Sequence, residues 1–516
     1  MNAPLGGFAT NAYQGAASNR LMGTAWRVWD NDPNDDWTND ALILAQRAWD
    51  LVRNDPVMAS LLSAKIVGTH GACGMRMRSL YQADANAKAT EDELRIRKDI
   101  EAVIAEASQG TQLDANGLAT RHELEEGIDE LATTSGEAFA VRCYVEDRPG
   151  AAVATCWRLV RMERVCNKPG EADSDRLYNG IALDANGQAE GIWVAPPRRT
   201  FLRSSPDQWT YVPWFAPDGS RNVIHRIGRR VPGSYRGVSM FAACLPTAKQ
   251  VKGLLEAYVV AKRVQACHPI IIECDDPVAA AKKDANGAVL GPNTVLEPGK
   301  FYYVGRGAGV SFPTWAFGGA DMQAFIDTLY RNEFASWGMP IDVVLAQLGR
   351  TNMAASRSAW QQYYRQCTRW QDDHIEQVSR PLDEAIVREA VARGRLTFPA
   401  GMSWQRIMAS RYVRPEQAMP DPLKEANAVA AWVALGRDKT GLWGESGVDF
   451  RESVQQRADD DAFEAQHGIT PTPAEAPAEP PAAAPTDQPP APAEDAPAEA
   501  EQADDAADPA NQDDKA

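Results

Sequence analysis

Apolar side chains recur at intervals of three and four residues in two stretches on either side of a β-rich segment. The positions are Val251, Leu254, Leu255, Tyr258 and Val259 in the first stretch, and Met322, Phe325, Ile326 and Leu329 in the second. This spacing puts the apolar side chains on one face of a helix. It predicts helices over residues 246–267 and 321–340, with Asp321 as the N-cap of the second.

Capping signals predict further helices. Thr90 is followed three positions later by Glu93, and Thr120 by Glu123. In such a capping box the Thr hydroxyl and the Glu carboxylate satisfy free backbone N–H groups at the start of a helix. The other predicted helices are Ala41–Val52, Met58–Val67, Met353–Val378 with a break at Arg380-Pro381, a continuation to Ala392, a helix opened by Asp421-Pro422 and stopped by Gly436, and Phe450–Gln466.

Between Gly136 and Ile227 the pattern changes to short β-rich runs separated by turns. The runs and turns are Ala138–Val145, Thr155–Val160, Asn179-Gly180, Asn186-Gly187 and the strand that ends at Trp193-Val194. Pro196-Pro197 follows and predicts that this last strand lies at a sheet edge. Two more runs, Ile270–Ile272 and Phe301–Val304, fall between the two long helices. The fold class is therefore α+β.

The charge is distributed unevenly. The formal net charge of the 516 residues is −17, and residues 471–516 carry twelve acids and one base, or −11. Subtracting −11 from −17 leaves −6 for the rest, which excludes a conventional DNA-binding protein with a basic surface. The Pro-, Ala- and acid-rich composition predicts a disordered tail over residues 469–516. We expect neither a signal peptide nor a membrane span, because no long apolar run is present.

The sequence offers no recognisable catalytic chemistry. It lacks a GxxxxGK[ST] loop, and Gly305–Gly309 has the wrong spacing for a phosphate loop and is interpreted as a turn. The six histidines form no HExxH pattern, and His70 with Cys73 is interpreted as structural. Asp459-Asp460-Asp461 is interpreted as a solvated helix face. The eight cysteines are expected to be buried or partly buried free thiols. We therefore expect no enzyme activity, no cofactor and no metal.

Several segments together resemble the lambda-type portal family of tailed double-stranded DNA phages. In chain order they are Ala12-Tyr13 with Gly15-Ala16-Ala17, Arg53-Asn54-Asp55-Pro56 leading to Lys65-Ile66-Val67-Gly68, Gly136-Glu137-Ala138-Phe139, Gly180–Asp184 with Asn186-Gly187, Val223-Ile224-His225 with Arg230–Gly233 and Arg236-Gly237-Val238, Asn352 with Ala355-Ser356-Arg357, and Asp421–Glu425. Two positions depart from the family pattern, Ser234 in place of Gln and Met353 in place of Tyr.

The resemblance implies a portal fold and a ring of subunits, a dodecamer. It implies a mixed α/β wing, a two-helix stem, a small β-containing clip, a helical crown and the disordered acidic tail. The implied regions are wing 1–245, stem helix 246–267, clip 268–320, stem helix 321–340, tunnel loop 341–352, second part of the wing 353–420, crown 421–468 and tail 469–516.

The resemblance also implies sites and partners. In the tunnel loop we expect four residues nearest the DNA, Gln347, Arg350, Thr351 and Asn352; the alternative is a plain surface loop. In the clip we expect docking contacts at Lys282, Lys283 and Asp284; the alternative is a solvated turn. Aromatic helix positions could serve ring contacts or an ordinary core. They are Trp337, Trp360, Tyr363, Tyr364 and Trp370.

As a portal, the protein would be made in the host cytoplasm and become part of the virion at a capsid vertex. Its expected partners are other copies of itself, the terminase large subunit, a head-completion or adaptor protein, and the major capsid and scaffold proteins. Double-stranded DNA would pass through non-specifically, and no membrane is involved. Two alternatives stay open at this point: another head–tail connector or minor capsid protein, and a hydrolase or nuclease with a hidden site.

Overall fold

The computed structural model describes the greater part of the chain. The described residues are 32–83, 90–197, 205–266, 270–274, 301–305, 320–346, 353–415 and 422–439, with scattered positions between 442 and 465. The chain divides into two units, Met1–Ser453 and Val454–Ala516, and nearly all described residues belong to the first. The predicted tail and most of the predicted helix Phe450–Gln466 lie outside the described residues. None of the described helices is long and apolar enough to cross a bilayer.

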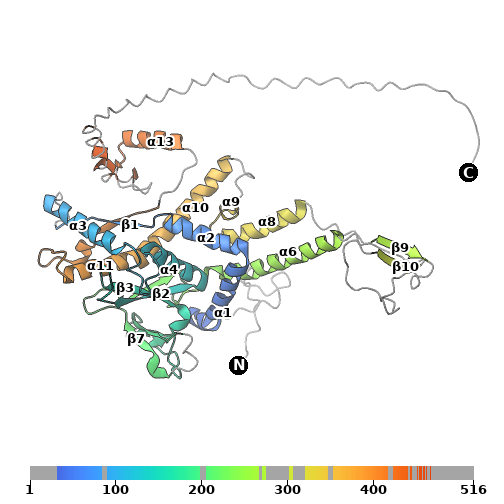
Figure 1. Ribbon diagram of the computed structural model, residues 1–516, viewed down its shortest axis with the longest axis horizontal. Coiled ribbons are helices and arrows are strands. Elements are labelled where there is room, and N and C mark those ends of the chain that lie inside the picture. Colours follow the sequence, from blue (N-terminus) through green and yellow to red (C-terminus); the bar gives the residue numbers. More distant parts are fainter. Residues whose placement is uncertain are drawn as a thin grey trace, which may run out of the picture. The chain divides into compact units, whose positions relative to one another are not determined.

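The described part of the N-terminal half contains four α-helices before its main sheets (Figure 1). They are α1 (Pro33–Asn54), α2 (Pro56–His70), α3 (Glu91–Ala107) and α4 (Arg121–Ser135). Both predicted capping boxes are confirmed. The side chains of Thr90 and Thr120 each accept a hydrogen bond from the backbone N–H of the N3 residue, and the side chain of the N3 Glu accepts one from the backbone N–H of the Thr. The first helix starts earlier than predicted, because Asp32 caps it and Pro33 occupies its first turn.

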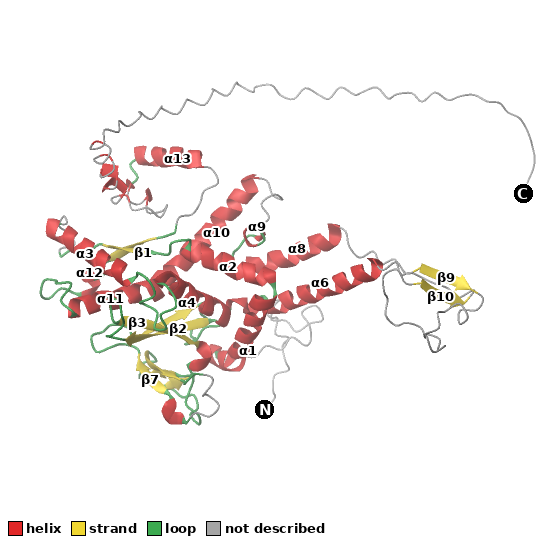
Figure 2. Ribbon diagram, viewed as in Figure 1, coloured by secondary structure: helices red, strands yellow, loops and turns green. Residues whose placement is uncertain are grey.

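Two antiparallel sheets follow. The first has the order β3-β2-β8, with β2 (Glu137–Tyr144) between β3 (Thr155–Arg161) and β8 (Val223–Ile227). Helices α4 and α11 (Arg380–Ala392) contact this sheet (Figure 2). The second sheet has the order β4-β5-β6-β7; its strands are Leu177–Tyr178, Ile181–Leu183, Ala189–Val194 and Thr210–Pro213.

The predicted turn at Asn179-Gly180 is confirmed, and one strand prediction is wrong. Both turn residues have positive φ, 43° and 85°, as a two-residue hairpin turn requires. However, β6, which ends at Val194, is not an edge strand, because β7 pairs with its second side through Trp193 and Tyr211. Pro196-Pro197 comes after the strand has ended, so it removes no hydrogen bond from the ladder.

A helical hairpin connects the two halves of the chain. Helix α6 (Leu245–Ala266) leads to β9 (Ile270–Cys274), and β10 (Phe301–Gly305) leads to α8 (Ala320–Ala335). Helices α6 and α8 lie against each other, and the two strands pair in parallel. Both helices and both strands were predicted. Asp321 lies inside the first turn of α8 rather than at its N-cap.

The C-terminal half is mostly helical. Its elements are α9 (Ile341–Val344), α10 (Met353–His374), η5 (Ile375–Ser379), α11, α12 (Trp404–Ile407), β11 (Ser410–Val413) and α13 (Pro422–Ala434). The predicted break at Arg380-Pro381 is wrong. The chain passes from α10 to α11 through the π-helical turn η5, and Ser379 and Arg380 keep helical backbone angles. Proline has no backbone N–H, and a π-helical turn changes the hydrogen-bond register just before it.

One pairing was not predicted. Strand β1 (Arg76–Ser79) pairs with β11 from the far end of the described body. Each strand has four residues, too few for an alternating pattern to identify. This pairing ties the C-terminal half to the N-terminal half.

The body is closed by residues from both sides of the hairpin. One core cluster packs Ile128 and Trp157 with Leu382 and Ile386. A second cluster packs residues of α1 and α2 with the bases of α6 and α8 and with α10. Of the aromatic positions predicted for ring contacts or core, three belong to this second cluster and two pack against it, which confirms the core alternative for the three buried residues. The positions are Trp337, Tyr363 and Trp370, buried, and Trp360 and Tyr364, partly buried.

The cysteines largely follow the expectation. Those within the described side chains are free, and five of these six are buried or partly buried. Cys73 differs because it is exposed, in the turn after α2. His70 is buried, and among the described residues it groups with Glu125 and His374 rather than with Cys73.

Candidate functional site

The residues expected to face DNA or docking proteins lie outside the described residues. They are Gln347, Arg350, Thr351, Asn352, Lys282, Lys283 and Asp284. The interior of the body instead contains two groups of buried charged side chains, which we name the Glu137 cluster and the Asp129 cluster. Charged side chains are rarely buried unless they are paired, so these two clusters are the candidate sites for chemistry.

The Glu137 cluster consists of Glu137, His225 and Arg236. The Arg236 Nε donates to Glu137 Oε1 at 2.6 Å, and His225 Nε2 lies 2.8 Å from Glu137 Oε2. The other guanidinium nitrogens donate to the carbonyls of Val165, Asn179 and Met162. Arg236 is fully buried, so these contacts supply it with both a counter-charge and acceptors.

Aromatic rings enclose the same cluster. The Arg236 guanidinium carbon lies 4.1 Å from the ring centroid of Trp37, and the His225 ring stacks on Phe139 with centroids 4.2 Å apart. Burial raises the pKa of the Glu137 carboxyl, but Arg236 and His225 oppose it and the net pKa is lowered. Burial lowers the pKa of His225 although Glu137 opposes this shift. The cluster is therefore a carboxylate–guanidinium pair with a neutral imidazole beside it.

Close backbone contacts bring these residues together. Gly136 has a φ of +105°, and a Cβ there would lie 2.6 Å from the carbonyl carbon of Val238. A Cβ on Gly237 would lie 2.2 Å from the carbonyl oxygen of Gly136. Only glycine fits both positions. The segments Gly136–Phe139 and Arg236–Val238 thus meet in space, which explains in physical terms why these sequence motifs contain glycine next to a charged residue.

The Asp129 cluster lies between α2, α4, α10 and β8. Asp129 Oδ1 accepts from Arg226 Nε at 2.7 Å, and Lys65 Nζ lies 3.9 Å from the same oxygen. Asp129 Oδ2 lies 3.0 Å from both His70 Nε2 and His374 Nδ1. All five side chains are almost fully buried. The Asp129 carboxylate of α4 therefore contacts four basic groups from three other elements.

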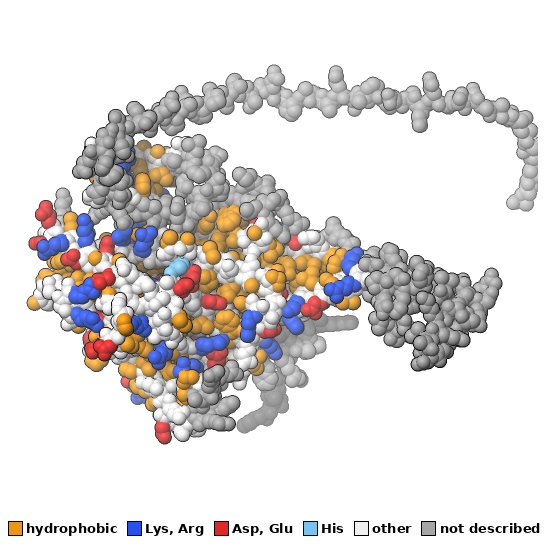
Figure 3. Space-filling model, in the orientation of Figure 1, with side chains coloured by type: hydrophobic (Ala, Val, Ile, Leu, Met, Phe, Trp, Pro, Cys, Tyr) orange, Lys and Arg blue, Asp and Glu red, His pale blue; other side chains and the backbone are white. Residues whose placement is uncertain are grey.

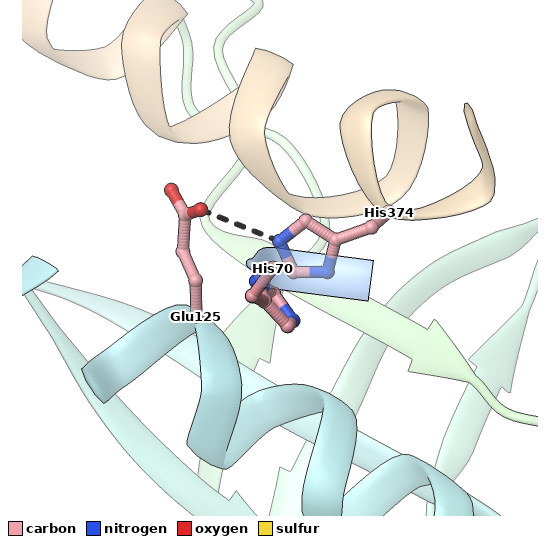
Figure 4. A group of neighbouring side chains, drawn as sticks. All are labelled: His70, Glu125 and His374. Atoms are coloured by element: carbon pink, nitrogen blue, oxygen red, sulfur yellow. Dashed lines mark ion pairs between the residues drawn. The ribbon is translucent and has the colours of Figure 1, made fainter. Parts of the chain in front are cut away.

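Glu125, one helical turn before Asp129 on α4, extends the cluster. Its Oε2 lies 3.5 Å from His374 Nε2, and its Oε1 accepts from Arg121 Nε at 2.9 Å. Arg121 also forms an ion pair with Asp383 of α11 at 2.7 Å. His374 thus contacts a carboxylate at each ring nitrogen, and Figure 4 shows the contact with Glu125.

A small residue lets the helices approach. A Cβ on Gly68 of α2 would lie 2.4 Å from the hydroxyl oxygen of Tyr363 and 2.8 Å from the sulfur of Cys367. The Tyr363 hydroxyl donates to the carbonyl of Ala64 at 2.7 Å. Helices α2 and α10 therefore pack closely near their C-terminal ends, and His70 and His374 stack edge to face with ring centroids 4.5 Å apart.

The surrounding charges determine the protonation states. Burial would raise the pKa of Asp129, but Arg226, Lys65 and His374 hold it well below its usual value. Burial would also raise the pKa of Glu125, but Arg121 and His374 outweigh it, and the pKa falls to about 2. Burial lowers the pKa of His374, yet the two carboxylates outweigh it and the net pKa is raised. An imidazolium between two carboxylates follows.

Two other bases in the cluster have lowered pKa values. Burial is the main cause of the lowered pKa of His70, against the hydrogen bond to Asp129. Burial also lowers the pKa of Lys65 to about 8, partly offset by Asp129. The cluster therefore favours one charged and one neutral histidine.

His70, Glu125 and His374 form a candidate metal centre by distance alone. One ligand atom from each lies within 4.8 Å of the others, and two histidines with a carboxylate suit zinc or iron. The charges do not fit, because Lys65, Arg121 and Arg226 already neutralise the carboxylates and a divalent cation would add two buried positive charges. One nitrogen of each histidine, His70 Nε2 and His374 Nδ1, is also engaged with Asp129. The arrangement is an ion-pair network that joins four elements.

The sequence interpretation found only part of these groups. Glu137, His225 and Arg236 lie within the motifs quoted for the resemblance, although no contact among them was predicted. The Asp129 cluster was missed, because its members are far apart in the sequence. A usable signal was present on α2, where the ionisable residues Lys65 and His70 interrupt an otherwise apolar run.

Comparisons with known proteins give one family. The profile described as "Phage portal protein, lambda family" matches residues 19–371. No curated protein sequence matches the chain. Among solved structures, the chain is similar to one from the neck of an empty GTA particle computed with C6 symmetry, at 15% identity and a TM-score of 0.40, covering 88% of this chain and 100% of that one.

Two further solved structures are similar. One comes from the virion of a native gene transfer agent (GTA) particle, at 12% identity and a TM-score of 0.36, covering 75% of this chain and 96% of that one. The other comes from the neck of a native GTA particle computed with C12 symmetry, at 13% identity and a TM-score of 0.40, covering 78% of this chain and 92% of that one.

Proposed function

Because the chain belongs to the lambda family of phage portal proteins, we propose that it is one subunit of a ring through which double-stranded DNA enters and leaves a capsid. The ring would occupy a capsid vertex in the virion. Its partners would be other copies of itself, the terminase large subunit, a head-completion or adaptor protein, and capsid and scaffold proteins. The role is structural, with no chemical step assigned to any side chain.

The observation that carries this proposal is that the α6–α8 hairpin is an insertion in a body whose core is built from the chain before and after it. Both core clusters contain residues from before and after the hairpin, so the body is complete without the strands β9 and β10. The hairpin is anchored at its base, where Val251 of α6 and Tyr330 and Phe334 of α8 are buried. A body with an anchored two-helix insertion suits a wing that carries a stem and a clip.

The surface of the hairpin supports assembly into a ring. Val259 and Val260 on α6 and Phe325 on α8 are 45%, 57% and 54% exposed, and hydrophobic side chains gather over this pair of helices in Figure 3. Clustered exposed apolar side chains mark contacts with other chains. In a ring, each subunit presents two different faces to its neighbours, and a two-helix stem has one on each side.

The regional assignments remain part of the proposal. We assign residues 1–245 and 353–420 to the wing, 246–267 and 321–340 to the stem, and 268–320 to the clip. Residues 341–352 would be the tunnel loop, and 421–468 the crown. A net charge of −6 outside the acidic tail suits a channel in which DNA slides, because a basic lining would bind phosphates and retard movement.

The tunnel-loop assignment has its own test. We expect Gln347, Arg350, Thr351 and Asn352 to lie nearest the DNA, and deletion of residues 346–352 to leave assembled rings intact but impair DNA packaging or retention. Phage yield from a complemented host measures this effect. An unchanged yield with intact rings would count against the assignment.

The clip assignment has a matched test. Lys282, Lys283 and Asp284 are proposed docking contacts, so charge reversal of the two lysines should weaken binding of the terminase large subunit to isolated rings. The control is charge reversal of Arg95, an exposed residue on α3 of the body.

Negative-stain imaging of the purified full-length protein tests the proposed function itself. We expect annular particles with a central opening. Particles of a single compact subunit under all assembly conditions would refute the proposal, and a monomer with metal-dependent hydrolytic activity would favour the enzyme alternative.

A further inference from the structure

A cavity of about 860 Å³ opens beside the Glu137 cluster. The turn before β6, strand β8 with the residues that follow it, and helix α10 surround it. Its lining includes four arginines and three large aromatic residues: Arg221, Arg229, Arg230, Arg369, Trp214, Tyr235 and Trp370. This volume is in the range of pockets that bind a ligand.

The four cavity arginines differ from the buried arginines nearby. Among the described residues, none of the four donates a hydrogen bond or forms an ion pair, whereas Arg226 and Arg236 are each held by a carboxylate at 2.7 and 2.6 Å. Asp373 is the one acidic residue in the lining. Four positive charges against one negative charge leave the cavity at +3 within a chain whose net charge is −17.

The unpaired charge selects an anionic ligand. Arginine forms paired hydrogen bonds with carboxylates and phosphates. Trp214 and Tyr235 are half-buried and present ring surface to the same cavity. Aromatic grooves of this kind bind proline rings in extended segments. The lining therefore combines features that suit a segment in which prolines alternate with acidic residues.

The chain contains such a segment. Residues 471–516 carry a net charge of −11, and prolines are interspersed with Glu and Asp throughout, as in Glu475, Glu479 and Asp487. We propose that the arginine-lined cavity of one subunit binds the acidic, proline-rich segment 471–516 of a second copy. The inference rests on the proposed ring for the presence of that second copy.

Charge favours this occupant over DNA. A free polyanion must approach an assembly in which every chain carries −17, and that repulsion opposes binding from solution. A segment tethered to a neighbouring subunit is present at an effective concentration in the millimolar range when its linker spans the distance. Attraction between exposed arginines and carboxylates is screened by salt, so the contact should weaken at high ionic strength.

Photo-cross-linking in the full-length protein tests the proposal. A photoreactive p-benzoylphenylalanine replaces Gln188, an exposed residue in the lining, and this version is co-expressed with a second version that carries an epitope tag. We expect cross-links from the cavity to peptides of residues 471–516 of the tagged copy. The Arg229→Glu/Arg230→Glu variant should reduce them about tenfold, as should 1 M salt.

A matched control separates the cavity from general charge. Arg365 is exposed on α10 like Arg369 but does not line the cavity, so Arg365→Glu should leave the cross-links unchanged and Arg369→Glu should reduce them. Rings without cross-links to the segment would overturn this inference alone. Monomers in the same samples would overturn both the proposed function and the second-copy occupant.

The remaining alternative is that the cavity binds nucleic acid. Binding of a labelled DNA duplex is measured on the same variants. If Arg229→Glu/Arg230→Glu abolished duplex binding while the cross-links to residues 471–516 stayed unchanged, the cavity would be a nucleic-acid site and the proposal would be wrong.

Discussion

The body and the α6–α8 hairpin differ in which side chains they bury and which they expose. In the body, charged groups such as Asp129 and Arg236 are buried and paired within one chain. In the hairpin, apolar groups such as Val260 and Phe325 are more than half exposed. The body therefore pairs its buried charges internally, whereas the hairpin carries exposed apolar side chains on both of its helices, a surface that we propose a second copy covers. The comparison indicates that folding and assembly depend on separate sets of residues.

The largest expected effect is on the body. Arg236→Ala leaves Glu137 as a buried carboxylate beside neutral His225, so the free energy of unfolding should fall by about 3–5 kcal/mol, the usual cost of removing one partner of a buried ion pair. Urea denaturation measures it. Arg365→Ala, at an exposed position, should change the value by less than about 0.5 kcal/mol. Equal effects of the two substitutions would contradict the assigned role of the Glu137 cluster.

A smaller effect is expected from the backbone contact beside that cluster. Gly136→Ala combines a left-handed φ with a Cβ 2.6 Å from Val238, so we expect a loss of about 2–4 kcal/mol of unfolding free energy. Gly233→Ala is the matched control, because its φ is +87° and nothing lies within 4 Å of an added Cβ. It should lose only about 1 kcal/mol. A similar loss at both positions would show that the close approach has no energetic consequence.

The Asp129 cluster gives a pH-dependent effect. The folded-state pKa of His374 is raised above its ordinary value of 6.5, so its stabilisation is fully present below pH 6.5 and is lost as the pH rises through the raised value. His374→Gln should therefore lower the free energy of unfolding by about 1–2 kcal/mol at pH 5.5 and by less at pH 8.5. Urea denaturation at both values measures this. A larger loss of unfolding free energy at pH 8.5 than at pH 5.5 would contradict the assignment of His374 as an imidazolium.

The features predicted from sequence are those with local signals. The capping box at Thr90 and Glu93, the Asn179-Gly180 turn and the apolar spacing of α6 each act through neighbours in the chain, so the residue order contains them. The resemblance to portal proteins also rested on short contiguous motifs such as Arg236-Gly237-Val238. For the hairpin, this local information was sufficient to predict both helices and both strands.

The features that escaped prediction depend on distant contacts. His70, Asp129 and His374 meet only because α2, α4 and α10 pack together, and no local pattern encodes that packing. The interior position of β6 depends on β7, which pairs with it after an intervening segment. The helical path through Pro381 depends on a π-helical turn that propensity arguments do not anticipate. Sequence alone also left the role of aromatic residues such as Trp370 undecided between core and interface.

The most direct test is the mass distribution of a hairpin variant. Twelve copies of the 56.3-kDa chain amount to about 676 kDa, and we expect the wild type to form particles near this mass. The double variant Val260→Glu/Phe325→Glu should remain folded at 56.3 kDa, while Leu118→Glu, at a body position that is 83% exposed, should assemble like the wild type. Assembly of the double variant at the wild-type mass would contradict the division between a self-sufficient body and a hairpin that joins subunits.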